Sequence, residues 1–356
     1  EWWLMKQAKA RNPKIILDAL PWGAPGWIGD GKYYSQDMAD YMVKFINGAK
    51  QIHGLDIEYV GIWNETPYDV AYIKLLKKTL LANGLTTKII AADLYENQWK
   101  ITDDFKTDAE LKEAVYAIGA HYSRVKGNVY VTGGALNSGK LLWSTEDQPF
   151  DESGLILQRD WVPGGRIWAQ VLNTNYIDGK ITKTQIWSPV TSYYDILAAP
   201  NSGLMYANTP WSGYYNVQAA IWVTAHTTQF AQPGWQYLDS ACGYLPGKGS
   251  YVAFKSPSAG DYSIVVETIG AATPQEAIGS VNFTDVTLGL VDLIGMFERF
   301  ADEETGIPKY AQGDSGSFLN KTASGMSMLM TQANINLKTV MKNIDDFWIE
   351  PIVEAQ

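Results

Sequence analysis

The first half of the chain alternates helical patterns with short apolar runs. Runs rich in β-branched and apolar residues predict strands at 15–20, 57–63, 88–93, 116–121, 141–144 and 184–188. Apolar positions three or four residues apart predict helices at 1–10, 36–52, 69–82, 107–115 and 163–176. Strands and helices that alternate in this way are typical of parallel βα units.

Six predicted strands fit either a doubly wound open sheet or part of a (β/α)8 barrel. We favour the barrel because polar residues close nearly every strand, which suits loops that converge on one face. A complete barrel has eight strands, and here a helix precedes the first one. The pattern therefore predicts an α/β fold: an incomplete (β/α)8 TIM barrel over residues 1–220 that lacks its first two strands. The chain also starts inside a helical pattern without an initiator Met or a signal peptide, so we expect an N-terminally truncated fragment.

The pattern changes after residue 220. Short alternating runs separated by Gly, Pro and Ser predict antiparallel strands of a partial β-sandwich over 221–268. Residues 269–356 carry few strand signals and are predicted to be mainly helical. Met and Leu at helical spacing from Met326 to Met341 form a stripe that is typical of a core or a subunit interface.

Composition narrows the possible functions. The 14 Trp and 21 Tyr residues suit carbohydrate binding, although most such rings in a protein belong to its core. A net charge of −10 argues against nucleic acid as a partner of the barrel. The single cysteine, Cys242, allows no disulfide within the chain. The three histidines are scattered without metal-ligand spacing, so we predict neither a metal nor another cofactor.

Two predicted strands end on acids. Tyr59-Val-Gly-Ile-Trp-Asn-Glu65 places Glu65 at the end of one strand, and Lys140-Leu-Leu-Trp-Ser-Thr-Glu-Asp147 places Glu146 at the end of another. Two carboxyl groups delivered to one barrel mouth are the minimum equipment for cleaving a glycosidic bond. The alternative is that either Glu is a salt-bridged structural acid.

Roles follow from the chemistry of the reaction. Counting two missing units, Glu65 ends the fourth strand and Glu146 the seventh, across a mouth that would hold their carboxyls about 5 Å apart. Glu65 would be the acid, its pKa raised by the other carboxylate and by apolar surroundings, and then the base. Glu146 would stay ionised and attack, while Asn64 would contact the sugar 2-hydroxyl.

Several neighbouring residues leave alternatives open. Asp147 is a rival nucleophile, but adjacent strand residues point to opposite faces, so only one of Glu146 and Asp147 faces the mouth. Asp93 and His121 also end strands, where each could orient a carboxylate or satisfy a loop backbone. Trp22 and Trp187 are candidate platforms for a sugar ring.

These same segments resemble the galactosylceramidase family of glycoside hydrolases. The likeness covers residues 1–268 and is carried by Glu1-Trp-Trp-Leu-Met-Lys, Leu20-Pro-Trp-Gly-Ala-Pro-Gly-Trp27, Gly61-Ile-Trp-Asn-Glu65, Ile118-Gly-Ala-His-Tyr122, Leu142-Trp-Ser-Thr-Glu-Asp147, Pro210-Trp-Ser-Gly213 and the run from Trp222 to Trp235.

The resemblance implies a barrel followed by a β-sandwich, and a retaining β-galactosidase of galactosphingolipid catabolism. It implies Glu65 as acid and base, Glu146 as nucleophile, and Trp22, Asn64 and Trp187 as galactose contacts. The partner would be a galactoside or galactolipid, and the compartment lysosomal or secreted. The family's first two barrel strands and its lectin domain are missing from this sequence, so we expect impaired activity.

The C-terminal segment resembles a different family. Gly270-Ala-Ala-Thr-Pro-Gln-Glu-Ala, Phe300-Ala-Asp-Glu-Glu-Thr-Gly-Ile-Pro-Lys-Tyr310 and Lys321-Thr-Ala-Ser-Gly-Met-Ser-Met-Leu-Met330 are similar to a tailed-phage portal protein, whose subunits form a ring for DNA packaging. This resemblance implies a chimeric join near residue 270. Two alternatives to the enzyme are therefore a structural portal subunit and a non-catalytic galactose-binding barrel.

Overall fold

The computed structural model describes residues 1–124, 130–149, 164–192, 203–207, 210–246, 249–257 and 260–268. Its central feature is a six-stranded parallel sheet whose strand order follows the chain, β1-β2-β3-β4-β5-β6. The strands are Asp18–Ala19, Tyr59–Val60, Lys88–Leu94, Val115–His121, Leu141–Asp147 and Ile181–Ile186. A doubly wound sheet reverses its strand order at a switch point. The sequential order therefore supports a partial (β/α)8 barrel over a doubly wound sheet.

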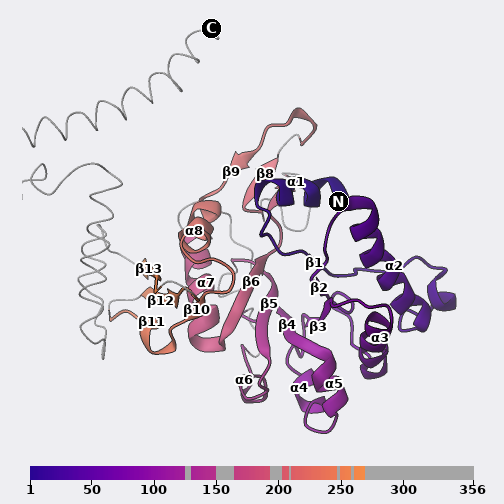
Figure 1. Ribbon diagram of the computed structural model, residues 1–356. Coiled ribbons are helices and arrows are strands. Elements are labelled where there is room, and N and C mark those ends of the chain that lie inside the picture. The colour runs from indigo at the N-terminus through magenta and orange to yellow at the C-terminus, as the bar shows by residue number, and fades with distance from the viewer. Residues whose placement is uncertain are drawn as a thin grey trace, which may run out of the picture. The chain divides into compact units, whose positions relative to one another are not determined.

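Helices lie in an arc outside this sheet (Figure 1). They are α1 Trp2–Arg11, α2 Gln36–His53, α3 Val70–Ala82, α4 Ile101–Asp104, α5 Ala109–Ala114, α6 Gly133–Leu136 and α7 Arg166–Gly179, with a 3-10 turn η1 at Ile28–Gly31. All five predicted helices are present, and all six predicted strands, with ends that differ by a few residues. The predictions for β1 and β2 were several residues too long, because an apolar run does not show where the ladder of hydrogen bonds stops.

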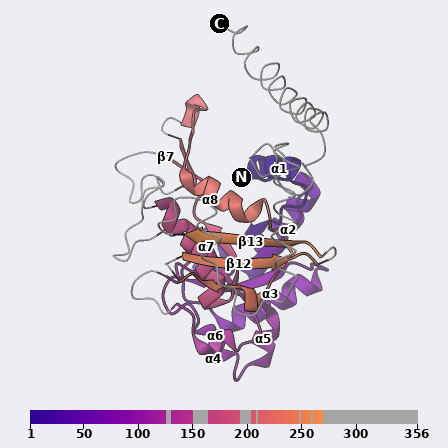
Figure 2. The ribbon, with the colours of Figure 1, turned by 90° about the vertical axis from the view of Figure 1, so that its left-hand side faces the viewer.

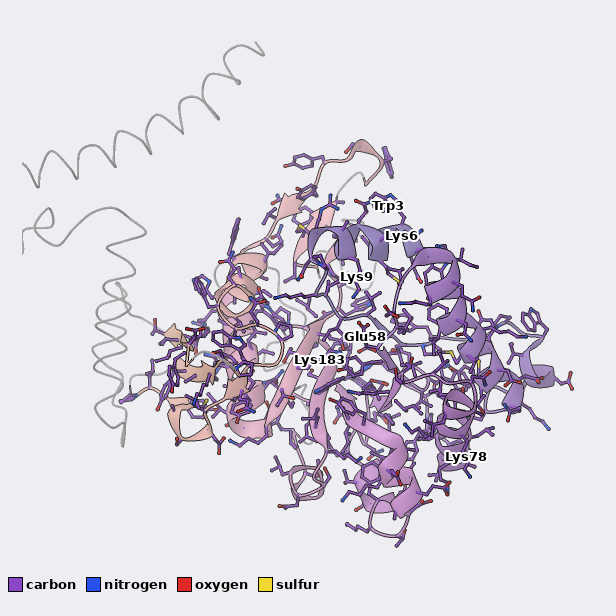
Figure 3. All side chains as sticks on the ribbon, viewed as in Figure 1. Trp3, Lys6, Lys9, Glu58, Lys78 and Lys183 are labelled. Atoms are coloured by element: carbon purple, nitrogen blue, oxygen red, sulfur yellow. The ribbon has the colours of Figure 1, made fainter. Side chains whose placement is uncertain are left out.

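Local sequence explains the helix boundaries. Ser35, Asp69 and Asp108 precede α2, α3 and α5, and each side chain accepts a hydrogen bond from a backbone N–H in the first turn. Gly54 ends α2 in the left-handed conformation at φ 68°. Lys9 of α1 lies 3.6 Å from Glu58, whose other oxygen accepts from the Leu17 N–H, so α1 is tied to the start of the sheet (Figure 3).

Strand β3 shows why the sheet is buried on both faces. Six of its seven residues, from Ile89 to Leu94, are buried, as expected for a parallel strand covered by helices on one side and by the barrel interior on the other. The face of β3 that is turned towards the helices belongs to the main core, where Met38, Ile73 and Leu80 are fully buried.

The two outer strands are linked by side chains. The strands form an open row, with β1 at one edge and β6 at the other. Lys183 of β6 nevertheless reaches Asp18 of β1 at 2.6 Å, and its ammonium lies 4.3 Å from the centroid of the Trp143 ring. Trp22 and Trp187, in the loops after β1 and β6, stack with ring centroids 6.4 Å apart. The row therefore curves enough for its edges to approach across the interior.

Residues 190–268 add two small sheets. The first has β7 Val190–Ser192, β8 Met205–Ala207 and β9 Asn216–Val217. The 3-10 turn η3 Pro210–Ser212 lies between β8 and β9 in the chain, and helix α8 Ala219–Thr228 follows β9. The second is antiparallel and has β10 Gln236–Tyr237, β11 Gly243–Tyr244, β12 Gly249–Lys255 and β13 Tyr262–Thr268, with η4 Asp239–Ala241.

The predicted β-sandwich is present only as one sheet in the residues that the structure describes. This sheet packs on helix α7 (Figure 2). Tyr176 of α7 stacks on Tyr237 at 3.6 Å, and Asn173 donates to Ser250. Alternating runs predicted the antiparallel strands correctly, but such a pattern does not show whether a helix or a second sheet covers them.

The predicted domain boundaries remain predictions. The boundary near 220 falls inside α8, and the segment 269–356 lies outside the described residues. Among the helices that the structure describes, none combines the length and the apolar character needed to cross a membrane.

Candidate active site

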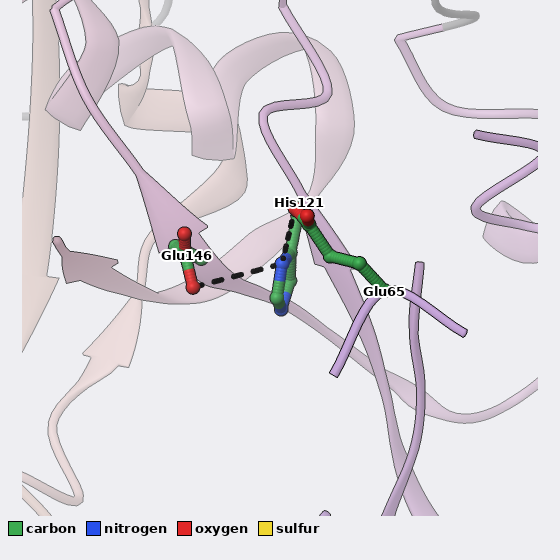
Figure 4. A group of neighbouring side chains, drawn as sticks. All are labelled: Glu65, His121 and Glu146. Carbon is green, nitrogen blue, oxygen red and sulfur yellow. Dashed lines mark hydrogen bonds and ion pairs between the residues drawn. The ribbon is translucent and has the colours of Figure 1, made fainter. Parts of the chain in front are cut away.

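Three side chains from different strands meet at the carboxyl ends of the sheet. Glu65 follows β2, His121 ends β4, and Glu146 lies in β5 (Figure 4). His121 Nδ1 is 3.1 Å from Glu65 Oε1 and 3.7 Å from Glu146 Oε2. The carboxyl ends of barrel strands are where active sites of this fold form. The structure thus brings Glu65 and Glu146 together at this end of the sheet, and their catalytic roles remain a proposal.

Backbone hydrogen bonds fix the positions of these residues. The Glu65 N–H donates to the Asp93 carbonyl, and the Tyr122 N–H donates to the Glu146 carbonyl. Glu65, Asp93 and Tyr122 have φ values of 47°, 54° and 50°, in the left-handed region that non-glycine residues rarely adopt. Such conformations cluster at functional sites, where the surrounding structure holds them in place.

The two carboxyl groups differ in burial. The Glu65 side chain is 35% exposed, whereas that of Glu146 is 11% exposed. Burial raises the pKa of Glu146, and the hydrogen bond from the Tyr122 hydroxyl and the charge of His121 act against that rise. We expected apolar surroundings for Glu65, but the structure gives it an imidazole and solvent instead. Sequence spacing did not reveal this, because the imidazole comes from a strand two positions along the sheet.

His121 is fully buried between acids. Burial by itself lowers the pKa of an imidazole, but the hydrogen bond with Glu65 and the charges of Asp93 and Glu146 outweigh it, so the pKa of His121 is raised. Of the two roles left open for His121, the geometry favours orienting a carboxylate, because its side chain contacts both Glu65 and Glu146. Its backbone carbonyl also accepts from Gln98, at 2.7 Å.

Asp147 points away from this cluster. Its carboxylate accepts from the Ser144 hydroxyl at 2.7 Å, from Asn175 at 3.0 Å and from the Gln148 N–H at 2.9 Å. The expectation that only one of the two adjacent acids faces the mouth is confirmed by this placement. Asp147 serves to anchor β5 to α7.

The predicted sugar contacts lie in three loops at the same end of the sheet. Trp22 is 60% exposed and Trp187 is 38% exposed. The Asn64 N–H donates to the Pro21 carbonyl, and its buried Oδ1 has no hydrogen-bond partner among the described residues. Trp63 is turned away and stacks on Tyr33 at 3.7 Å. Tyr122 was not predicted as a site residue, although it follows His121 directly at a strand end.

One oxygen or nitrogen atom from each of Glu65, His121 and Glu146 lies within 4.8 Å of the others, a separation that would admit a metal ion. These atoms already contact one another, and His121 Nδ1 is engaged by Glu65.

Comparisons with known proteins show which proteins this chain is similar to. The chain is 47% identical over 275 residues to galactocerebrosidase of Mus musculus, a match that covers 76% of this chain and 38% of the mouse protein. It is 41% identical over 309 residues to galactocerebrosidase of Danio rerio, covering 85% of this chain and 44% of that protein. The chain thus spans about two fifths of the length of these curated relatives.

The fold has a solved counterpart. An endo-β-1,6-glucanase superposes with a TM-score of 0.60 and 21% identity, over 75% of this chain and 67% of the glucanase. Because the zebrafish match covers 85% of the 356 residues, it extends past residue 268 into the segment that we expected to be portal-like. The portal interpretation of 269–356 gains no support from these comparisons.

A family model matches the part of the chain that contains the site. The model of glycosyl hydrolase family 59 matches residues 1–229, a range that contains every site residue described above. The chain therefore belongs to glycosyl hydrolase family 59.

Proposed function

We propose that this chain carries the active site of a retaining β-galactosidase that hydrolyses galactosylceramide-like galactosides by double displacement. The observation that carries the proposal is the convergence of Glu65 and Glu146 on one imidazole, with an oxygen of each within 4.8 Å of the other. Retaining enzymes hold their carboxyl groups about 5–5.5 Å apart, and inverting enzymes about 6.5–9.5 Å. The substrate class rests on the mouse and zebrafish relatives, which are named galactocerebrosidases.

In the first step Glu146 attacks the anomeric carbon while the bond from that carbon to the leaving oxygen breaks. Glu65 gives its proton to the leaving oxygen, so the aglycone departs as a neutral alcohol. The Tyr122 hydroxyl donates to Glu146, which favours the ionised form that attacks.

In the second step Glu65, now ionised, takes a proton from water. The resulting hydroxide attacks the anomeric carbon, the ester bond to Glu146 breaks, and both acids return to their starting states. The partial exposure of Glu65 suits this step, because the attacking water must reach it.

The glycone would lie against Trp22 and Trp187, whose rings are exposed and stacked on each other at the mouth. The unpartnered Oδ1 of Asn64 would accept from a sugar hydroxyl. We expect weaker activity than a closed barrel would give, because the edges β1 and β6 are joined by side chains alone and Trp22 is 60% exposed.

The test is hydrolysis of aryl β-galactosides by the parent chain and by Glu146→Gln, Glu65→Gln and Glu96→Gln. Glu96, an exposed acid in the loop after β3, is the matched control and should retain parent activity. Glu146→Gln should lose turnover of all substrates. Glu65→Gln should lose most turnover of a phenyl galactoside but keep formation of the glycosyl-enzyme from a dinitrophenyl galactoside, whose leaving group needs no acid.

Equal activity in all three variants would refute the assignment of the acids. Binding of galactose without any cleavage by the parent chain would favour a non-catalytic galactose-binding barrel instead. Proton NMR of the first product tests the retaining stereochemistry, since an α-anomer released first would require an inverting mechanism.

A further inference from the structure

Asp93 occupies a chamber that two glycines leave open behind Glu65, His121 and Glu146. Its carboxylate is 2% exposed and lies between β2 and β4 on the inner side of the sheet. A Cβ on Gly61 would come within 2.9 Å of Asp93 Oδ2, and a Cβ on Gly119 within 2.4 Å of Oδ1. Real Cβ atoms essentially never approach so closely, so a side chain just after β2 at residue 61, or in β4 at residue 119, would force a neighbour to shift.

Among the residues that the structure describes, Thr145 alone donates a side-chain hydrogen bond to the Asp93 carboxylate, at 2.6 Å. Its Oδ2 has no partner among the described residues, and neither has Nε2 of the fully buried His121. His121 Nε2 nevertheless faces this carboxylate, since it lies 3.9 Å from Asp93 Oδ1, the oxygen that accepts from Thr145. That distance is too long for a direct hydrogen bond, but in a buried site the electrostatic interaction across it is strong.

The proximity selects one tautomer of the imidazole. A lone pair on Nε2 facing a buried carboxylate would be repelled, whereas an Nε2–H is attracted. With Nε2 protonated, the Nδ1 of a neutral His121 is an acceptor. The contact of 3.1 Å between Nδ1 and Glu65 Oε1 then holds one proton, either as Glu65 O–H donating to Nδ1 or as Nδ1–H donating to Glu65.

We infer that Asp93 is a positioning residue that fixes the His121 tautomer and thereby keeps a proton shared between His121 and Glu65. The inference rests on the proposed function for its catalytic meaning, because that proton is the one Glu65 gives to the leaving oxygen. The burial of Asp93 and the two glycines that accommodate it are otherwise without a role in the site.

The charges near the shared proton set the pH at which that proton is lost. Glu146 faces Nδ1 from β5, Asp93 faces Nε2 from β3, and the Tyr122 ring lies at 6.0 Å from the imidazole. Burial raises the pKa of Asp93, while the charge of His121, the hydrogen bond from Thr145 and the charge of Lys183 act against that rise. Besides Glu65, which shares the proton, the nearby carboxylates are those of Asp93 and Glu146. Removing the charge of Asp93 leaves only that of Glu146, so the shared proton should be lost at lower pH.

The direct test is 15N NMR of the histidine rings in the full chain. The chain has three histidines, and His53 and His226 serve as internal references. In the parent we expect His121 to carry its proton on Nε2. In Asp93→Asn the titration midpoint of the His121 ring should fall by about one pH unit.

The matched control is Asp147→Asn, which neutralises an equally buried acid next to Glu146. It should leave the His121 midpoint unchanged within about 0.3 of a unit. If Asp93→Asn does not fold, as judged by circular dichroism, Thr145→Val provides the second variant. Removing its hydroxyl disfavours the ionised form of Asp93, so the midpoint should move in the same direction by a smaller amount.

A kinetic measurement links the inference to catalysis. The basic limb of kcat/KM for a phenyl galactoside should move down by about one pH unit in Asp93→Asn, and glycosylation by a dinitrophenyl galactoside should change little. A parent His121 with its proton on Nδ1, or a midpoint that Asp93→Asn leaves unchanged or that Asp147→Asn moves equally, would overturn the inference. A parent chain without galactosidase activity would count against the proposed function alone, since the NMR result does not depend on turnover.

Discussion

Gly119→Ala offers a sharp test of the packing behind the active site. Gly119 lies in β4, opposite Ala92 of β3 and Trp143 of β5. An added Cβ would lie 2.4 Å from Asp93 Oδ1, 2.8 Å from Ile90 Cγ2 and 2.8 Å from Thr145 Oγ1. All three distances are below those of real Cβ contacts, and Asp93 and Ile90 are buried while Thr145 is half-buried, so something must shift.

The cost can be worked out from these contacts. Overpacking by one methyl group in a rigid interior costs about 1–3 kcal/mol. Displacing Thr145 from the Asp93 carboxylate loses a charge-assisted hydrogen bond worth about 1.5–3 kcal/mol. Replacing glycine within a strand returns about 0.5–1 kcal/mol through the unfolded chain. We therefore expect Gly119→Ala to lower the free energy of unfolding by about 2–5 kcal/mol.

The assay is urea unfolding followed by tryptophan fluorescence. The matched control is Gly48→Ala in helix α2, where a Cβ would meet nothing within 4 Å. The same substitution there should raise stability by about 0.5–1 kcal/mol, because alanine is the better helix former. A Gly119→Ala protein as stable as the parent, or one that gains stability like Gly48→Ala, would refute the reasoning about the chamber around Asp93.

Three further predictions concern the site and the fold. Tyr122→Phe removes a hydrogen bond to the ionised Glu146, so the pKa of Glu146 should rise and the acid limb of kcat/KM should move to higher pH by about one unit; an unchanged limb would contradict the role of Tyr122. Trp187→Ala should raise KM for an aryl galactoside about three- to tenfold with little change in kcat, while Trp3→Ala, at an exposed ring of helix α1, should leave both constants unaltered. Lys74 and the Leu111 N–H lower the pKa of Asp108, so its contribution to stability is present above its unfolded pKa of about 3.9 and is lost as pH falls through the lowered value. The stability difference between the parent and Asp108→Asn in urea unfolding should therefore be constant above about pH 5 and shrink below about pH 4, and a difference independent of pH would argue against the pairing.

The sequence predicted the sheet well because local patterns carry the necessary information. Largely apolar runs such as 88–93 indicated buried parallel strands, and helical spacing located α2 and α3 within about one residue at each end. Runs that end on Glu65 and Glu146 placed both acids at the carboxyl ends of strands. The helix that covers the antiparallel sheet could not be predicted in this way, since its packing depends on contacts such as that between Asn173 and Ser250, which are 77 positions apart.

The sequence by itself determined which residues end the strands and which of them are acids, because strand periodicity and residue type are properties of short segments. Only the tertiary structure decided that His121 lies between Glu65 and Glu146, that Asp147 turns away, and that Asp93 lies behind the imidazole. These relations join strands separated by tens of residues, and they depend on the twist and register of the sheet. The surroundings of a carboxyl group, and therefore its pKa, are fixed by neighbours that no local pattern can show.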